Sequence, residues 1–204
     1  ALPTKVSVTG LKQLKTGRAE ELTLRRRPAF MEEQGPVRAA EAGTAVHLVL
    51  QKLPPAAGME EAVIKQCISD LTTAQELTEA EAAAVDTEKL LRYYRSDLVR
   101  RMLESGKVYR EVPFEAAFPA AGLGLHPDSG EPVILQGMID CYFEEDGGIT
   151  LVDYKTDFYR HKEELAEKYR VQLELYARAI EKITKKIVKH KILYLFFGND
   201  VIEY

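Results

Sequence analysis

Two aspartates and a lysine occupy positions where a predicted β-hairpin would bring them together. An Asp-Gly pair at 146–147 separates two apolar, β-branched and aromatic runs in the stretch LQGMIDCYFEEDGGITLVDYKTD. This pattern is a strong short-range hairpin signal. With these two residues as the loop, Asp140 lies opposite Asp153, and Lys155 shares the face of Asp153 because side chains alternate along a strand. Since like charges opposite each other in a sheet are unfavourable, the arrangement predicts a divalent cation between the acids, with the lysine beside it.

The alternative is a surface hairpin that carries ordinary solvated charges. The neighbours of the three residues are apolar on both strands: Met138, Ile139, Tyr142, Phe143, Ile149, Leu151 and Val152. Charged groups in so apolar a sheet cost free energy unless they are paired or bind a ligand. The functional interpretation is therefore favoured over the surface hairpin.

Four polar residues on other elements are weaker candidates. His47 lies on the apolar stripe of a predicted helix, where a lone histidine is more often a core residue, and the residues alone favour that interpretation. Gln172 and Tyr176 share a helix face at spacing i, i+4. A DNA strand or the catalytic acids could satisfy the glutamine, and a buried side-chain network explains it equally well. Glu111, in the strand REVPF, is either solvated or faces the acids.

Charge and composition limit the function classes. The net charge of −4 argues mildly against a domain that binds nucleic acid by charge alone. Two distant cysteines, Cys67 and Cys141, exclude a cysteine-ligated zinc or iron–sulfur site and fit a reducing cytosol. No apolar run is long enough to span a bilayer, and the first residues do not resemble a signal peptide. The chain begins with alanine, so we expect a fragment of a larger protein.

Basic residues gather in three short clusters, and each could contact phosphates. For the first two clusters, a solvated face is the preferred interpretation. The third cluster directly follows the hairpin, and DNA contacts and a solvated face are equally good interpretations of it. The clusters are Arg25, Arg26 and Arg27; Arg92, Arg95, Arg100 and Arg101; and Arg160, His161 and Lys162.

The order of predicted elements indicates an α/β fold with a mixed sheet. Residues 1–36 have weak periodicity, with a short helix predicted to begin after a Thr9 cap and an extended stretch over 20–36. Residues 37–105 show successive helical patterns, including a capping box that begins at Thr78. Residues 106–204 follow the order strand, strand, strand, helix, strand, strand. A strand–helix–strand crossover within that order predicts a mixed sheet.

Several short motifs, taken in chain order, resemble a known family of nucleases. They are GTxxH at 43–47, ExPF at 111–114, GxID at 137–140, DYK at 153–155 and QLxxY at 172–176. This series is similar to the nuclease domain of the RecB-like branch of the PD-(D/E)XK superfamily. The stretches VSVTGLKQL, RRRPAF and LVDYKTD resemble, more narrowly, the C-terminal nuclease domain of the A subunits of bacterial AddAB helicase–nucleases. The resemblance extends from Lys5 to Tyr204.

The resemblance implies a restriction-endonuclease-like fold and a metal site. The fold would have a central mixed sheet flanked by helices, plus an N-terminal helical region, in a single nuclease domain over residues 1–204. By the same resemblance, Asp140, Asp153, His47 and the main-chain carbonyl of Tyr154 hold the metal. The expected ion is Mg²⁺, and Mn²⁺ or Ca²⁺ could substitute for it.

The resemblance also assigns roles to the remaining candidates. Lys155 matches the catalytic lysine, Gln172 and Tyr176 match a helix motif that lines the site, and Glu111 matches an accessory acid. No iron–sulfur cluster is expected, because the four cysteines that hold one in some relatives are absent.

The function implied is metal-dependent hydrolysis of DNA phosphodiester bonds. The domain would belong to an ATP-dependent helicase–nuclease that processes double-strand breaks for recombinational repair. We expect it in the bacterial cytoplasm, with no membrane among its partners. Its partners would be DNA, with single-stranded ends, the helicase part of the parent chain and a second subunit. No GxxxxGK[ST] phosphate loop is present. The alternatives are a non-catalytic DNA- or subunit-binding module of the same fold, against which the intact acids and lysine argue, and an unrelated metal hydrolase of small phosphate esters.

Overall fold

The computed structural model describes residues 3–11, 39–126 and 129–204. Its elements, in chain order, are β1 (Lys5–Ser7), α2 (Ala39–Lys52), α3 (Glu61–Thr73), α4 (Glu79–Ala84), α5 (Thr87–Tyr94), α6 (Asp97–Ser105), β2 (Val108–Pro119), the 3₁₀-helix η2 (Ala121–Leu123), β3 (Pro132–Glu145), β4 (Gly148–Lys155), α7 (Lys162–Thr184), β5 (Val188–Leu195) and β6 (Asp200–Glu203). The predicted order of helices followed by β-β-β-α-β-β is confirmed, and no helix among the described residues is long and apolar enough to cross a membrane.

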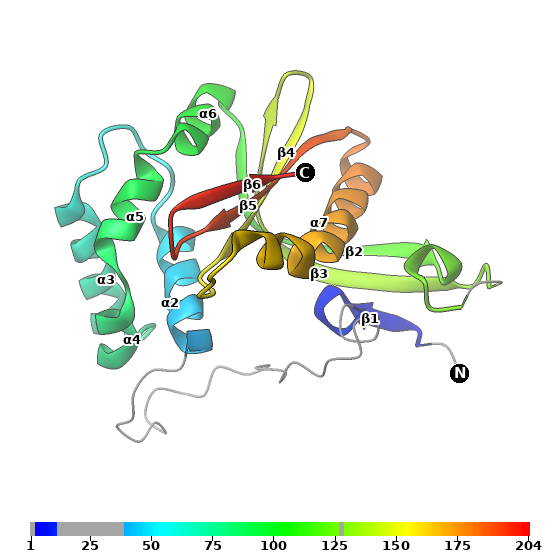
Figure 1. Cartoon of the computed structure of the whole chain (residues 1–204), viewed down its shortest axis with the longest axis horizontal. Coiled ribbons are helices and arrows are strands. Elements are labelled where there is room, and N and C mark those ends of the chain that lie inside the picture. The colour runs from blue at the N-terminus through cyan, green and yellow to red at the C-terminus, as the bar shows by residue number, and fades with distance from the viewer. Residues whose placement is uncertain (1–2, 12–38, 127–128) are drawn as a thin grey trace.

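The strands form one mixed sheet, as predicted. β4 and β5 pair in parallel, whereas β2 with β3, β3 with β4 and β5 with β6 pair antiparallel. The parallel pair is joined through α7, which supplies the crossover that parallel strands require. In Figure 1 the long β2–β3 pair extends from the centre of the molecule past α7, with β1 alongside the extending part of β3.

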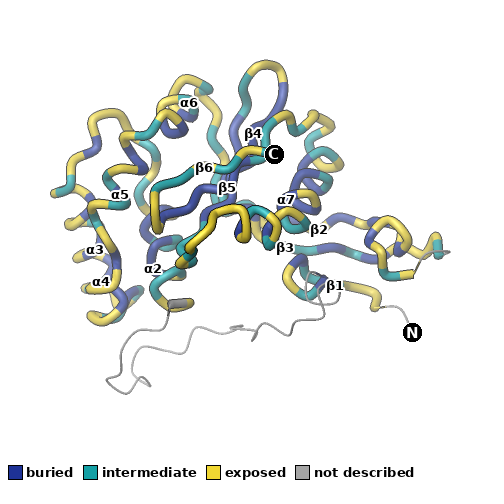
Figure 2. Tube along the Cα trace, viewed as in Figure 1, coloured by how far each residue is buried: buried dark blue, intermediate teal, exposed yellow. Residues whose placement is uncertain are grey.

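Helices cover the two faces of the sheet, and each face has its own apolar core. α7 packs on one face, where it meets Ile149 and Leu151 of β4, while the helices α2–α6 pack on the other, where they meet Val152 and Tyr154. This division follows the alternation of side chains along β4. Figure 2 shows the central strands largely buried and the outer sides of the helices exposed.

Local sequence signals account for several element ends. The Thr78 hydroxyl accepts a hydrogen bond from the Glu81 N–H, and the Glu81 carboxylate accepts one from the Thr78 N–H, so the predicted capping box is confirmed. Gly106 ends α6 in the left-handed conformation. Asp146 and Gly147 have φ of 49° and 72°, as the type I′ turn of a two-residue hairpin requires.

The N-terminal prediction is wrong in two details. Lys5–Ser7 form β1, which pairs in parallel with β3, although the sequence pattern gave no strand there. The following helical residues begin at Val8, so Thr9 lies inside the first turn and does not cap it. The predicted extended stretch over 20–36 lies outside the described residues, as do the arginines at 25–27.

Candidate active site

Along one side, β3 pairs first with β1 and then with β4. The sheet forks between these two partners, and this fork is the candidate site. Residues 134–136 pair with β1, and residues 141–145 pair with β4. The pairing between β3 and β4 ends at Cys141 opposite Val152, in the register that the hairpin predicted. Just beyond it, the Asp140 carboxylate accepts a hydrogen bond of 2.8 Å from the Tyr154 N–H. The Asp140 side chain thus accepts the hydrogen bond of the Tyr154 N–H, which no longer pairs with the backbone of β3 once the ladder has ended.

Asp153 and Lys155 lie on the α7 side of the fork as a close ion pair. The Lys155 Nζ is 2.6 Å from Asp153 Oδ2, which confirms the predicted shared face. The Asp153 side chain is only 1% exposed. The Gln172 amide donates a hydrogen bond of 3.0 Å to Asp153 Oδ1 and lies 3.5 Å from the Tyr176 hydroxyl. α7 therefore fixes the orientation of the Asp153 carboxylate from above the sheet.

His47 reaches the other side of the fork from α2. Its Nε2 is 3.2 Å from the main-chain carbonyl oxygen of Tyr154, and its Nδ1 is 3.6 Å from Asp140 Oδ1. Ligand atoms of His47, Glu111 and Asp140 all lie within 4.8 Å of one another. The His47 side chain is 29% exposed, so the interpretation as a core histidine does not describe it. Asp153 is outside this group of three, since its carboxylate is directed to Lys155 and Gln172.

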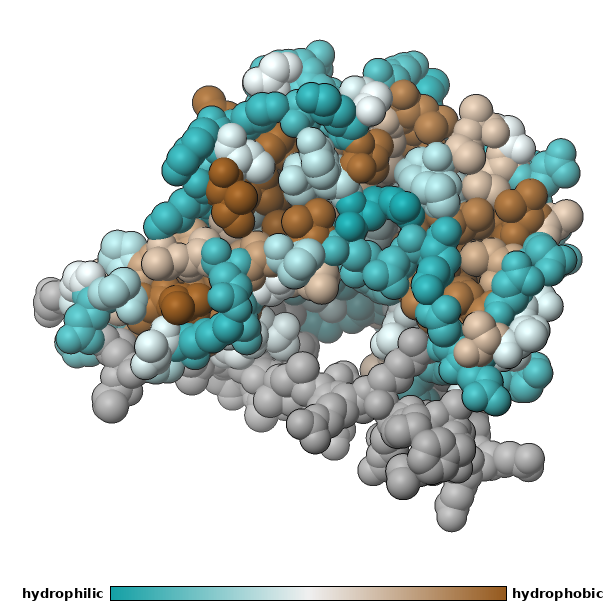
Figure 3. Space-filling model, turned by 180° about the vertical axis from the view of Figure 1, so that it is seen from behind, coloured by the Kyte–Doolittle hydropathy of each residue, from teal (hydrophilic) through white to brown (hydrophobic). Residues whose placement is uncertain are grey.

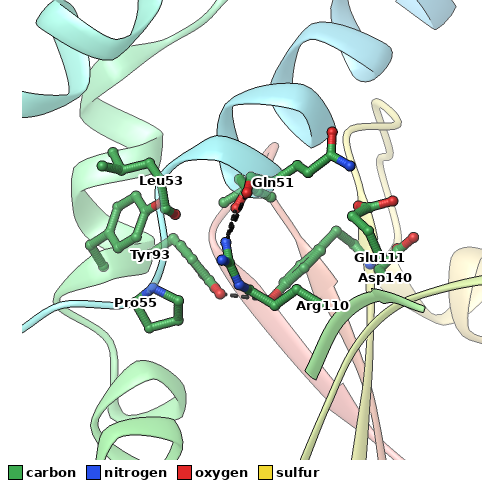
Figure 4. Close-up of a pocket in the computed structure, with 10 residues that line it drawn as sticks. Gln51, Leu53, Pro55, Tyr93, Arg110, Glu111 and Asp140 are labelled. Carbon is green, nitrogen blue, oxygen red and sulfur yellow. Dashed lines mark hydrogen bonds between the residues drawn. The ribbon is translucent and has the colours of Figure 1, made fainter. Parts of the chain in front are cut away.

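Glu111 adopts a backbone conformation that a non-glycine residue rarely takes. Its φ is +48°, in the left-handed region. The residues on either side of it, Arg110 and Val112, keep their pairing with β3, opposite Cys141 and Ile139. Local strain of this kind is found at functional sites. Here it accompanies a carboxylate held next to Asp140, as Figure 4 shows.

Arg110 connects this acidic strand to the helix that carries His47. Its guanidinium donates hydrogen bonds of 2.9 and 3.0 Å to the carbonyl oxygens of Leu50 and Gln51, in the last turn of α2. A cation at this end of a helix also complements its dipole. Arg110 therefore positions α2 relative to Glu111, a role that the sequence analysis missed. Its place next to Glu111 in the strand was the only available signal.

Two motif glycines permit the close packing of the site. A Cβ on Gly43 would lie 2.7 Å from the Thr156 hydroxyl, so the glycine lets α2 approach the segment that follows β4. A Cβ on Gly137 would lie 2.7 Å from the Phe114 ring and 3.2 Å from the ring of Tyr176. These contacts explain physically why GTxxH and GxID begin with glycine.

The electrostatics of the fork indicate excess negative charge. Burial raises the pKa of Asp153 to about 6, although Lys155 acts in the opposite direction. Burial, and then the charge of Asp140, raise the pKa of Glu111. Burial opposes the charge on Lys155, but the carboxylates of Asp153 and Asp140 outweigh it and raise the pKa of the ammonium. Acids whose ionised forms are disfavoured are well suited to a bound cation.

The third basic cluster does not lie among the acids. Arg160, His161 and Lys162 are exposed on the segment between β4 and α7. Lys162 lies 3.8 Å from a carboxylate oxygen of Asp200, at the start of β6. The cluster therefore stays a prediction for DNA contacts near the site.

Comparison with known proteins identifies the family. A family model described as the PD-(D/E)XK nuclease superfamily matches residues 8–203. The chain belongs to the PD-(D/E)XK nuclease superfamily. It is also 37% identical, over 99% of its length, to the A subunit of an ATP-dependent helicase/nuclease of Clostridium novyi (strain NT), and 39% identical, over its whole length, to that of Thermoanaerobacter sp. (strain X514). The chain spans about a fifth of the length of these relatives, 18% in each case.

The match confirms the resemblance that the motifs gave and the fold that it implied. The chain is a PD-(D/E)XK nuclease domain related to the nuclease part of helicase/nuclease A subunits. PD-(D/E)XK nucleases use divalent metal ions. The donor set of the fork suits such an ion, because it offers carboxylate oxygens, a main-chain carbonyl oxygen and an imidazole nitrogen.

Proposed function

We propose that this chain hydrolyses phosphodiester bonds of DNA with the help of Mg²⁺. The observation that carries the proposal is the fork in the sheet. It places three potential ligands, His47, Glu111 and Asp140, within 4.8 Å of one another, beside the ion pair of Asp153 and Lys155. An acid cluster next to a largely buried lysine, 15% exposed, has a clear use in phosphodiester hydrolysis and little use in a module that only binds.

The metal would be held by His47, Asp140, Asp153 and the carbonyl oxygen of Tyr154, with Glu111 as an accessory acid. Mg²⁺ prefers oxygen ligands, and Mn²⁺ accepts an imidazole more readily. A bound ion of this kind lowers the pKa of water and neutralises charge on the phosphate. The raised pKa values of Asp153 and Glu111 support the proposal, because both carboxylates would gain from a cation nearby.

The side chains around the metal ligands would orient the substrate and stabilise charge. Lys155 remains protonated because two carboxylates favour its ammonium form. Held 2.6 Å from Asp153, it can donate hydrogen bonds to the attacking water or to a phosphate oxygen and stabilise charge that develops there. Gln172 keeps the Asp153 carboxylate in place, and Tyr176 packs behind Gln172.

The relatives suggest the wider setting of this reaction. Their name describes the A subunit of an ATP-dependent helicase/nuclease, which supports DNA as the substrate and a helicase part elsewhere in the parent chain. We propose in addition that the partner is a second helicase–nuclease subunit, that the preferred DNA has single-stranded ends, and that the protein acts in recombinational repair of double-strand breaks in the bacterial cytoplasm. Exposed Arg160, His161 and Lys162 would contribute phosphate contacts.

Digestion of labelled DNA tests the proposal. The purified chain is incubated with single- and double-stranded DNA of one sequence, with Mg²⁺, Mn²⁺ or EDTA, with and without ATP, across a salt series. We expect cleavage that needs the metal, does not need ATP, favours single strands and falls steeply with salt, because phosphate contacts release counterions. A strict ATP requirement would reveal a nucleotide site that the sequence does not show. Absence of cleavage with every metal would favour the non-catalytic binding module.

A further inference from the structure

Two phenylalanine rings lie exposed together just beyond the ends of the neighbouring strands β4 and β5. Phe158 is 69% exposed and Phe197 is 40% exposed, and their ring centroids are 4.7 Å apart at an interplanar angle of 72°. Isolated apolar residues on a surface are ordinary, but two adjacent large rings are not. The apolar patches on the rear face, shown in Figure 3, are spread among hydrophilic side chains.

The pair is close to the proposed active site. Lys155 and Leu195 are partners in the parallel ladder, so Phe158 and Phe197 follow the same ends of neighbouring strands. Phe158 is three residues beyond Lys155, a span of at most about 10 Å. The intervening Thr156 packs against Gly43 of α2, the helix that carries His47. Figure 1 shows the gold segment after β4 and the red turn between β5 and β6 close to α2.

Contacts of Tyr159, and of the turn between β5 and β6, hold the Phe197 ring in place. The Tyr159 ring contacts Phe197 at 5.4 Å, and the Tyr159 hydroxyl donates a hydrogen bond to the Asp200 carboxylate. The Asn199 amide donates to the carbonyl oxygen of Lys89 in α5, at 3.0 Å, and so ties the β5–β6 turn to the helical layer. Phe197 is therefore held in place, and Phe158 packs against it, so a ligand would meet a largely ordered Phe197 ring.

Cations lie beside the pair, together with acids that are themselves paired, and Lys89 also lies 3.7 Å from Asp86. The Lys89 ammonium lies 4.9 Å from the centre of the Phe197 ring, and Arg160 is exposed two residues after Phe158. The acids nearby already have partners, since Asp157 binds Lys168 and Tyr169, and Asp200 binds Tyr159. Aromatic faces interleaved with cations fit a single-stranded nucleic acid, whose bases stack while its phosphates meet the basic groups. A duplex fits less well, because its base faces are covered by neighbouring bases.

We propose that Phe158 and Phe197 form a stacking platform for bases of the single DNA strand that enters the active site. The inference rests on the proposed nuclease function and adds the residues that would select single strands. In a duplex the strand would have to open before its bases could stack on the rings. The platform would therefore act on affinity for single strands and leave the hydrolytic groups unchanged.

Binding of fluorescent oligonucleotides to the full 204-residue chain, in low-salt buffer with EDTA, tests the platform. The probes are a 15-nucleotide single strand, the same strand with abasic sites, and the matching duplex. We expect Phe158→Ala to weaken single-strand binding about five- to tenfold, at the lower end of reported stacking contributions, and to leave duplex binding unchanged. The Phe158→Ala variant should also bind the intact and the abasic strand with equal affinity. The matched control is Ile187→Ala, which removes an equally exposed apolar side chain, 68% exposed, directly before β5.

Two further variants distinguish stacking from other contacts. Phe158→Tyr should restore binding, whereas Phe158→Leu, which keeps an apolar surface without a ring, should not. If Phe158→Leu binds as the wild type does, or if Phe158→Ala binds both strands with wild-type affinity, the platform is wrong, and the pair is an apolar contact for another part of a larger protein. If one of these outcomes is observed and the wild-type chain still cleaves DNA with metal, the stacking platform is wrong but the proposed nuclease function stands. If the wild-type chain neither binds DNA in EDTA nor cleaves it with metal, both proposals fail.

Discussion

Replacing Asp153 with asparagine should remove a pH-dependent loss of stability from the metal-free protein. The Asp153 side chain is 1% exposed, and burial raises its pKa from the ordinary 3.8 to about 6. Between these values the folded protein binds more protons than the unfolded chain does. The free energy of unfolding therefore falls as the pH rises through this window. Above it, the folded protein carries a buried carboxylate that no metal compensates.

The size of this loss follows from the shift. At about 1.4 kcal/mol for each tenfold change in the ionisation constant, the full loss is about 3 kcal/mol. About 2 kcal/mol of it falls between pH 4.5 and pH 7.5, because the unfolded carboxyl is already largely ionised at the lower value. For a chain of this length, that corresponds to about 4–8 °C in the thermal midpoint.

The assay is thermal or urea unfolding of both proteins in EDTA at several pH values. Asparagine resembles the protonated acid and does not titrate, so differences in packing and hydrogen bonding between the two side chains add a constant offset, whereas the attraction of Lys155 for the ionised carboxylate is already part of the pKa of Asp153. The informative quantity is therefore the change with pH in the difference between wild type and variant. Asp146→Asn, at the exposed hairpin turn, is the matched control and should follow the wild-type pH profile.

A parallel pH dependence in the wild type and the Asp153→Asn variant would show that Asp153 is ionised in the fold without penalty, contrary to this prediction. The opposite trend, with the wild type gaining relative stability as the pH rises, would show that Lys155 outweighs burial. Addition of Mn²⁺ at pH 7.5 should stabilise the wild type more than the variant, since a cation favours the ionised carboxylate.

Two further substitutions test the rest of the fork. His47→Ala should fold and bind Mn²⁺ more weakly by calorimetry; unchanged Mn²⁺ affinity together with a large loss of stability would instead make His47 a packing residue. Glu111→Gly should be more stable than Glu111→Gln by about 1 kcal/mol in urea unfolding, because only glycine relieves the left-handed backbone. Both Glu111 variants lose the same carboxylate, so equal stabilities would show that this backbone conformation carries no strain.

The sequence predicted the hairpin and the face that its charged residues share, because both depend on local rules. An Asp-Gly pair favours one turn type, that turn sets the register, and the register places Lys155 beside Asp153. Helix ends were also predictable where a capping residue or a glycine marks them, as at Thr78 and Gly106.

Features that depend on distant contacts could not be predicted in this way. β1 has only three residues, and its pairing with β3, more than a hundred residues away, defines it as a strand. The left-handed φ of Glu111 and the bonds from Arg110 to α2 arise where β2 meets other elements, and no local pattern encodes them. Phe158 and Phe197 become neighbours only because β4 and β5 pair in parallel. The roles of His47, Gln172 and Tyr176 came from the resemblance and stay predictions.

Cleavage and metal binding by a Lys155→Ala variant would decide whether this fork is the active site. Lys155 is beside the acids but is not among the proposed ligands, so its removal should separate the chemistry from the metal site. Mn²⁺ binding is measured by calorimetry and cleavage of labelled single-stranded DNA by gel, on the same preparations of wild type and variant. We expect the variant to fold and to retain Mn²⁺ binding but to lose cleavage. Wild-type cleavage by the Lys155→Ala variant would contradict the assignment of this fork as the active site.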